Sequence, residues 1–142
     1  MSMERTFSII KPDAVAAGHA GEILSLIEQS GFRILALRLT RLNREQAEGF
    51  YAVHRERPFF PSLVKFMTEG PIVVMALERD NAVAKLREII GATNPANAAE
   101  GTIRKRFAES IERNCIHGSD GPDTAQVELA YFFSTLDLAG KL

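Results

Sequence analysis

The sequence has a single cysteine, no long apolar run and no excess of one charge. Cys115 cannot form an internal disulfide, and no spacing of cysteine and histidine resembles a zinc site. The longest apolar runs, such as residues 72–77, are far shorter than the ~20 residues that span a bilayer. The N-terminal residues lack the apolar core and cleavage site of a signal peptide. We therefore expect a cytoplasmic protein with no membrane partner.

The charges nearly cancel, with 17 Lys+Arg against 18 Asp+Glu, and this balance argues against a dedicated nucleic-acid-binding protein. Only five of the basic residues are lysine and twelve are arginine. Because guanidinium forms paired hydrogen bonds with phosphate, a neutral chain of this kind can still hold a local anion site. The length of 142 residues, with 46% hydrophobic and 25% charged residues, predicts one globular domain over 1–142.

The pattern of apolar residues predicts strands that alternate with helices. Strands are expected at 5–10, 33–40 and 72–77, and helices at 21–31, from 43, at 62–68 and from 80. In 33–40, Leu37 and Leu39 alternate with Arg38 and Thr40, as on a half-exposed strand. The helix from 43 opens with a capping-box signature, Asn43-x-x-Gln46. Residues 127–133 have strand-like composition, but residues 120–123 resemble a helix start, and we favour a helix. This order predicts an α+β or α/β fold, with helices packed on one sheet.

The segment Asn114-Cys-Ile-His-Gly-Ser-Asp120 contains the first candidate for chemistry, His117, which we expect to lie in a polar stretch after a short strand. A neutral imidazole is a good nucleophile near neutral pH. Gly118 permits close approach of a backbone or substrate, and Ser119 and Asn114 offer a hydroxyl and an amide. A histidine without such neighbours is more often structural, as we expect for His54 at the edge of the core.

Basic residues form the second candidate set. Lys11 follows the first strand, Arg87 lies late in a helix, and Arg104 follows a turn. A triphosphate site needs several such charges to converge, because phosphoryl transfer depends on positioning and charge neutralisation. The sequence has neither a Walker-type loop nor Gly-x-Gly-x-x-Gly, and no cluster of carboxylates for a metal. Any magnesium would then arrive on the nucleotide phosphates.

Two adjacent aromatic residues, Phe59 and Phe60, lie between prolines. They cannot both face one side of a regular element. Either both lie in the hydrophobic core, or one packs while the other is exposed at the lip of a cleft, where it can stack on a base.

The segment 114–120 resembles the active-site signature of the nucleoside diphosphate kinase family, Asn-x-x-His-Gly-Ser-Asp. Further blocks similar to that family occur in the family's order and cover essentially the whole chain. They are residues 6–14, 50–60, 70–71, 91–95 and 101–104.

The resemblance implies an enzyme that moves the γ-phosphate of a nucleoside triphosphate, typically ATP, to a nucleoside diphosphate by a ping-pong mechanism. His117 matches the nucleophile that becomes a phosphohistidine. Glu128 matches the carboxylate that orients it, and Ser119 supports that hydrogen-bond network. Lys11 matches the lysine that contacts the transferring phosphate, and Tyr51 the tyrosine near it.

The same resemblance implies how the nucleotide is held. The positions that match phosphate-binding residues are Arg87, Thr93 and Arg104, and His54 falls close to the phosphates. Asn114 matches the residue at the sugar, and Phe59 the aromatic that stacks on the base. The implied cofactor is Mg²⁺.

The implied fold is a ferredoxin-like α+β sandwich with a four-stranded antiparallel sheet, assembled as dimers into a tetramer or hexamer. Arg106 departs from the family, which often has an aspartate there, so one partner of a local salt bridge is missing while Arg104 is intact.

Two other functions are compatible with such a fold. A catalytically silent relative is expected to lack one of Lys11, Arg104, Asn114 and His117, and all four are present. A small regulatory domain of ferredoxin-like fold would leave Phe59 and the phosphate-binding residues unexplained.

Overall fold

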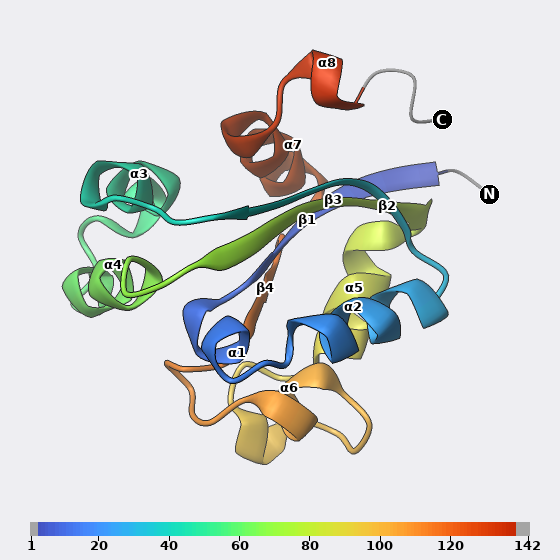
Figure 1. Ribbon diagram of the computed structural model, residues 1–142, viewed down its shortest axis with the longest axis horizontal. Coiled ribbons are helices and arrows are strands. Elements are labelled where there is room, and N and C mark those ends of the chain that lie inside the picture. Colours follow the sequence, from blue (N-terminus) through green and yellow to red (C-terminus); the bar gives the residue numbers. More distant parts are fainter. Residues whose placement is uncertain (1–2, 139–142) are drawn as a thin grey trace.

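The structure, a computed structural model, describes residues 3–138 and contains one four-stranded antiparallel sheet (Figure 1). The strands are β1 (Met3–Ile10), β2 (Arg33–Thr40), β3 (Ile72–Asp80) and β4 (Ile116–Gly118), in the order β2-β3-β1-β4. The central position of β3 agrees with its sequence, since its first seven residues are all buried. The predicted α+β, ferredoxin-like class is confirmed.

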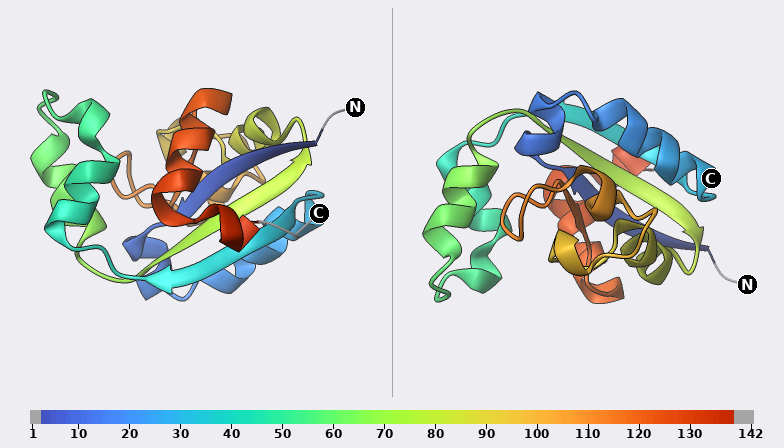
Figure 2. Two further views of the ribbon diagram at one scale, coloured as in Figure 1. Left: turned by 90° about the horizontal axis from the view of Figure 1, so that it is seen from above. Right: turned by 90° about the horizontal axis from the view of Figure 1, so that it is seen from below.

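Helices cover both faces of this sheet (Figures 1 and 2). The α-helices are α1 (Pro12–Ala16), α2 (Ala20–Gln29), α3 (Arg44–Phe50), α4 (Phe60–Met67), α5 (Ala82–Ile90), α6 (Ile103–Phe107), α7 (Pro122–Phe132) and α8 (Thr135–Leu138). Short 3-10 helices follow at Ala52–His54 and Pro95–Asn97. In Figure 1, α7 and α8 lie above the sheet, α2 and α5 lie below it, and α3 and α4 pair beside its end.

Two apolar clusters form the core, one on each face of the sheet. Residues of β1 alternate between them, because successive side chains of a strand point to opposite faces. Phe7 and Ile9 belong to the cluster that includes Leu129 of α7. Ile10 belongs to the other cluster, which includes Ile27 of α2 and Leu86 of α5. No helix within residues 3–138 is both long and apolar enough to span a bilayer.

Most of the predicted elements are present, with shifted ends. Residues 122–132 form α7, so the helix favoured there is correct. The capping box at Asn43 is confirmed, since its side chain accepts the Gln46 amide at 2.8 Å. The helix expected at 62–68 begins two residues earlier, because Pro61 fits the first turn, where a missing N–H is tolerated. The helix expected from 80 begins at Ala82, after β3.

The alternation expected in strand 33–40 is wrong. Leu37 and Leu39 are not its inward residues: they are 50% and 66% exposed, whereas Leu35 is buried. The cause is a register shift between Ile34 and Ala36 on β2, which lies at the edge of the sheet.

Candidate active site

The sequence predicts that His117 follows a short strand, but His117 lies within the strand β4. It pairs with Ile9 of β1, and its carbonyl oxygen accepts the Ser8 hydroxyl at 2.6 Å. The imidazole is 19% exposed and lies against two phenylalanine rings, Phe7 at 6.1 Å and Phe50 at 5.7 Å between centroids. The strand and these rings fix the direction in which the imidazole points.

One nitrogen of this imidazole is engaged by α7. His117 Nε2 lies 2.8 Å from Glu128 Oε1, and Ser119 Oγ donates to the same oxygen at 2.6 Å. Because a carboxylate oxygen only accepts, the neutral ring carries its proton on Nε2, and Nδ1 retains its lone pair. The geometry therefore brings together the three residues predicted as nucleophile, orienting carboxylate and supporting hydroxyl.

The close approach expected at Gly118 is made by the core and not by a substrate. A Cβ at this position would lie 2.8 Å from Ile90 Cδ1 and 3.3 Å from Leu86 Cδ2, both on α5. Glycine is required here because α5 packs directly on β4.

A second group of predicted residues lies at the end of β1. Lys11 Nζ donates to Asn114 Oδ1 at 2.7 Å, and both side chains are buried. Arg104, from α6, donates to three backbone carbonyl oxygens, those of Asn114 at 3.2 Å, Gly91 at 3.2 Å and Ile116 at 2.8 Å. These bonds fix the guanidinium and leave two of its five N–H groups available.

Burial and a neighbouring positive charge lower the pKa of each of these two cations. Burial, together with the positive charge of Arg104, lowers the pKa of Lys11 to about 8. The pKa of Arg104 is lowered by burial and by Arg87. Both groups would be stabilised by an anion between them.

A cavity of about 340 Å³ opens beside Lys11 and Asn114, and Arg104 does not line it. Its lining residues are Lys11, Phe59, Ser62, Leu63, Thr93, Ile111, Glu112 and Asn114. Phe59 is 44% exposed, whereas Phe60 packs against the core. Of the two alternatives for this pair, the one with a single exposed ring is therefore correct. Sequence reasoning missed Ile111, although a lone apolar residue in a polar segment was a signal for it.

Aromatic rings connect this cavity to His117. The Phe50 ring meets those of His117 and Tyr51, and His54 lies between Tyr51, at 6.4 Å, and Phe59, at 5.4 Å. The Tyr51 hydroxyl is buried with no hydrogen-bond partner within residues 3–138. Burial and the charge of Glu128 raise the pKa of Tyr51, so this hydroxyl stays protonated and can donate.

Arg87 does not line the cavity. Its guanidinium pairs with Asp120 at 2.9 Å and lies 3.4 Å from the Gly118 carbonyl oxygen, close enough to Arg104 to lower its pKa. Arg106, the departure from the family pattern, pairs with Glu22 at 3.4 Å. The chain thus makes a local ion pair here with a partner on α2.

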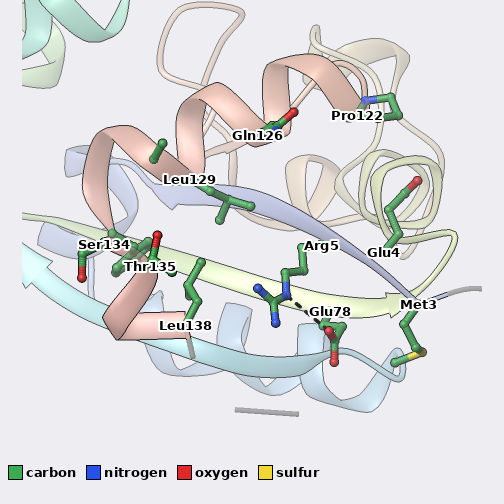
Figure 3. Close-up of a pocket in the computed structure, with 12 residues that line it drawn as sticks. Met3, Glu4, Arg5, Glu78, Pro122, Gln126, Leu129, Ser134, Thr135 and Leu138 are labelled. Carbon is green, nitrogen blue, oxygen red and sulfur yellow. Dashed lines mark hydrogen bonds and ion pairs between the residues drawn. The ribbon is translucent and has the colours of Figure 1, made fainter. Parts of the chain in front are cut away.

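A larger cavity, of about 650 Å³, lies elsewhere, where α7 and α8 cover the sheet (Figure 3). Figure 3 shows Arg5 and Glu78 pointing toward one another there, joined at 3.4 Å. None of the described residues that line it is histidine, lysine or cysteine. The larger cavity offers no nucleophile comparable with His117. The smaller cavity is the candidate site, because Lys11 and Asn114 line it. Within residues 3–138 no three His, Cys, Asp or Glu side chains are grouped to hold a metal ion.

Comparison with known proteins agrees with this geometry. The family model described as nucleoside diphosphate kinase matches residues 4–138. The nucleoside diphosphate kinase of Oleidesulfovibrio alaskensis is 61% identical over 137 residues, which are 96% of this chain and 99% of that protein. That of Chlamydia pneumoniae is 60% identical, over 96% of this chain and 94% of that protein.

Two solved structures are similar to the whole fold. The crystal structure of the Aquifex aeolicus nucleoside diphosphate kinase superposes with a TM-score of 0.95 at 45% identity, covering 97% of this chain and 100% of the other. The Halobacterium salinarum nucleoside diphosphate kinase, solved in complex with CDP, superposes with a TM-score of 0.92 at 38% identity, covering 97% and 92%.

Proposed function

The chain belongs to the nucleoside diphosphate kinase family, enzymes that transfer phosphate between nucleotides, and we propose that in this chain Nδ1 of His117 carries the phosphate. The observation that carries the proposal is the 2.8 Å contact of Nε2 with Glu128, because it leaves Nδ1 as the nitrogen with a free lone pair. That lone pair attacks the γ-phosphorus of a nucleoside triphosphate. An N–P bond forms, the bond from phosphorus to the bridging oxygen breaks, and the nucleoside diphosphate leaves with those electrons.

The second half-reaction reverses these bonds. A terminal oxygen of an acceptor nucleoside diphosphate attacks the phosphorus, and the N–P electrons return to Nδ1. The ring is positive while it carries the phosphate, and Glu128 stabilises that charge through Nε2–H. The Ser119 hydroxyl holds the same carboxylate oxygen at 2.6 Å, which keeps it directed at the imidazole.

We propose that the phosphates lie against Lys11 and Arg104, with Asn114 at the sugar. The burial of both cations supports this, since burial and a neighbouring positive charge lower their pKa values, and a bound anion opposes both effects. Thr93 lines the cavity, and His54 contacts both Phe59, which also lines it, and Tyr51, whose buried hydroxyl has no hydrogen-bond partner within residues 3–138; we propose that all three serve the same site. Arg87 is proposed to exchange Asp120 for phosphate when nucleotide binds, because a surface ion pair of this kind is weak.

The base is proposed to lie between Phe59 and Ile111. Both are exposed apolar residues that line one cavity. Stacking uses the π-face that every base has, so this slot would accept different bases with similar affinity.

We propose that Mg²⁺ reaches the site on the nucleotide. Phosphate oxygens are the hard ligands that this ion prefers, whereas Lys11 and Arg104 suit an anion. When bound, the ion supplies neutralisation of phosphate charge.

We further propose a homo-oligomer, tetramer or hexamer, that works in the cytoplasm as one domain per chain, without membrane or dedicated nucleic-acid partners. Support for assembly comes from β2, an edge strand with Leu37 and Leu39 exposed, since such edges pair with other chains unless covered.

Incubation with γ-labelled ATP and magnesium tests the central step. We expect acid-labile, alkali-stable label on His117, which GDP removes as labelled GTP. The His117→Ala variant should bind ADP and take up no label. Label on serine, or exchange at the wild-type rate by this variant, would show that another residue is the nucleophile.

A further inference from the structure

Asp13 is a buried carboxyl group that the proposed mechanism does not use. It is the second residue of α1 and only 6% exposed. Its Oδ2 accepts the Cys115 amide at 3.1 Å, while its Oδ1 is buried without a hydrogen-bond partner within residues 3–138. A buried oxygen left without a partner destabilises the folded protein. A compensating benefit is therefore expected close by.

The backbone that Asp13 holds is strained. Cys115 has φ +63°, in the left-handed region that side chains other than glycine seldom adopt. The same turn holds the other side of this residue, since the Lys11 amide donates to the Cys115 carbonyl oxygen at 2.8 Å. Cys115 is thus fixed at both its N–H and its C=O by residues 11–13. It lies between Asn114 and the strand that carries His117.

The charge of Asp13 also acts on the buried Lys11, since Asp13 binds Cys115 and the Lys11 ammonium group binds the adjacent Asn114. The groups that act on Lys11 are the guanidinium of Arg104 from α6, the thiol of Cys115 before β4, and the carboxyl of Asp13 from α1; Arg113 acts on Asp13. Burial and the negative charge of Asp13 raise the pKa of the Cys115 thiol to about 12, so this thiol is uncharged at neutral pH. Asp13 is then the carboxylate that opposes Arg104 at Lys11.

We propose that Asp13 is a positioning residue for phosphotransfer: its carboxylate holds the Cys115 amide in place and keeps Lys11 Nζ an ammonium group beside Arg104. This inference rests on the proposed function, in which Lys11 contacts the transferring phosphate. The Lys11 pKa of about 8 supports this inference, because it lies only slightly above neutral pH. Loss of the Asp13 charge would lower it until the uncharged amine is the major form at neutral pH. Burial raises the pKa of Asp13 itself. Hydrogen bonds from backbone amides and the positive charge of Lys11 oppose that rise.

The Asp13→Asn variant removes the charge and keeps an acceptor for Cys115. We expect the Lys11 pKa, followed by NMR of ¹³Cε-lysine protein without nucleotide, to fall by on the order of one unit. The alkaline limb of kcat/KM should move down by the same amount, which is a loss of about tenfold above the limb and little loss below it. Asp123→Asn is the matched control, because Asp123 is an exposed acid in the first turn of α7.

A merely structural role would lower activity by one factor at every pH and leave Lys11 unmoved, and that result would overturn the proposal. If Asp13→Asn does not fold, the wild-type protein still decides: the Asp13 carboxyl carbon should show an inflection at the Lys11 pKa, and its absence would equally overturn the proposal. Failure of the proposed function is separate, since it appears as absence of label on His117 in the wild type.

Discussion

At the scale of single residues, Glu128 has the most demanding position, because one of its oxygens meets two partners. Oε1 lies 2.8 Å from His117 Nε2 and 2.6 Å from Ser119 Oγ. Both contacts are strongest when the carboxylate is charged. A phosphorylated, positive imidazole needs that charge more than the neutral ring does, so the contact stabilises the transfer more than the resting enzyme.

Glu128→Gln is expected to preserve the fold and lower kcat. The loss of a charge-assisted hydrogen bond of ~1.5–3 kcal/mol corresponds to a decrease of about 10- to 100-fold. Steady-state exchange between ATP and GDP measures it, and KM should change little, because Glu128 does not line the cavity. Gln126→Ala, on the exposed side of α7, is the control. A wild-type kcat in Glu128→Gln would remove Glu128 from the mechanism.

Phe59→Ala is expected to weaken the binding of every nucleotide by a similar factor. Base–aromatic stacking contributes ~1–3 kcal/mol, and the Phe59 ring is exposed to a ligand in the cavity. Calorimetric titration with ADP, GDP and CDP measures this change. Val53→Ala removes a more exposed apolar side chain from the neighbouring segment and should leave affinity unchanged. An equal effect of both variants, or none, would mean that the base lies elsewhere.

At the scale of elements, the three residues of β4 carry the nucleophile, and α5 fixes their position. Ile90 and Leu86 leave no room for a Cβ at Gly118. A shift of α5 or β4 would therefore move His117 relative to Glu128 on α7. The packing of this pair of elements is thus linked directly to the geometry of the site.

Gly118→Ala should destabilise the protein by ~1–3 kcal/mol, as overpacked core positions do, and lower exchange activity in the fraction that remains folded. Denaturant unfolding gives the free energy. Gly21→Ala is the matched control: nothing lies within 4 Å of the added Cβ, and alanine is the better helix former in α2. That variant should be unchanged or up to ~1 kcal/mol more stable. Equal stability of the two variants would contradict the packing argument.

The elements also show which parts of the molecule a sequence can predict. The signature around His117 was predicted because it rests on a local pattern of residues. For Phe59 and Phe60 the residues alone left two alternatives, and the family resemblance indicated Phe59 as the exposed ring. The contact of Asp13 with Cys115 spans 102 positions and follows from the pairing of β1 with a strand too short to have a periodic pattern. The exposure of Leu37 and Leu39 was mispredicted for a related reason, since a register shift is set by the neighbouring strand.

At the scale of the whole molecule, the buried groups Lys11 and Cys115 have opposite effects on stability at alkaline pH. An unfolded lysine keeps its proton to about 10.5, but folded Lys11 loses it near 8, so unfolding takes up a proton between these values and stability rises with pH. For Cys115 the order is reversed. The thiol titrates near 9 when unfolded and near 12 when folded, so folding retains a proton and stability falls as pH rises above 9.

Cys115→Ala removes the second effect and leaves the first. The free energy of unfolding of this variant, relative to the wild type, should therefore increase by about 1.4 kcal/mol for each pH unit above the unfolded thiol pKa. Urea unfolding of both proteins at a series of alkaline pH values measures the difference, in which the other titrating groups largely cancel. Cys115→Ser, with a different packing loss, should show the same slope, which separates the proton effect from the lost contacts. A difference independent of pH would mean that the folded thiol titrates as it does in the unfolded chain.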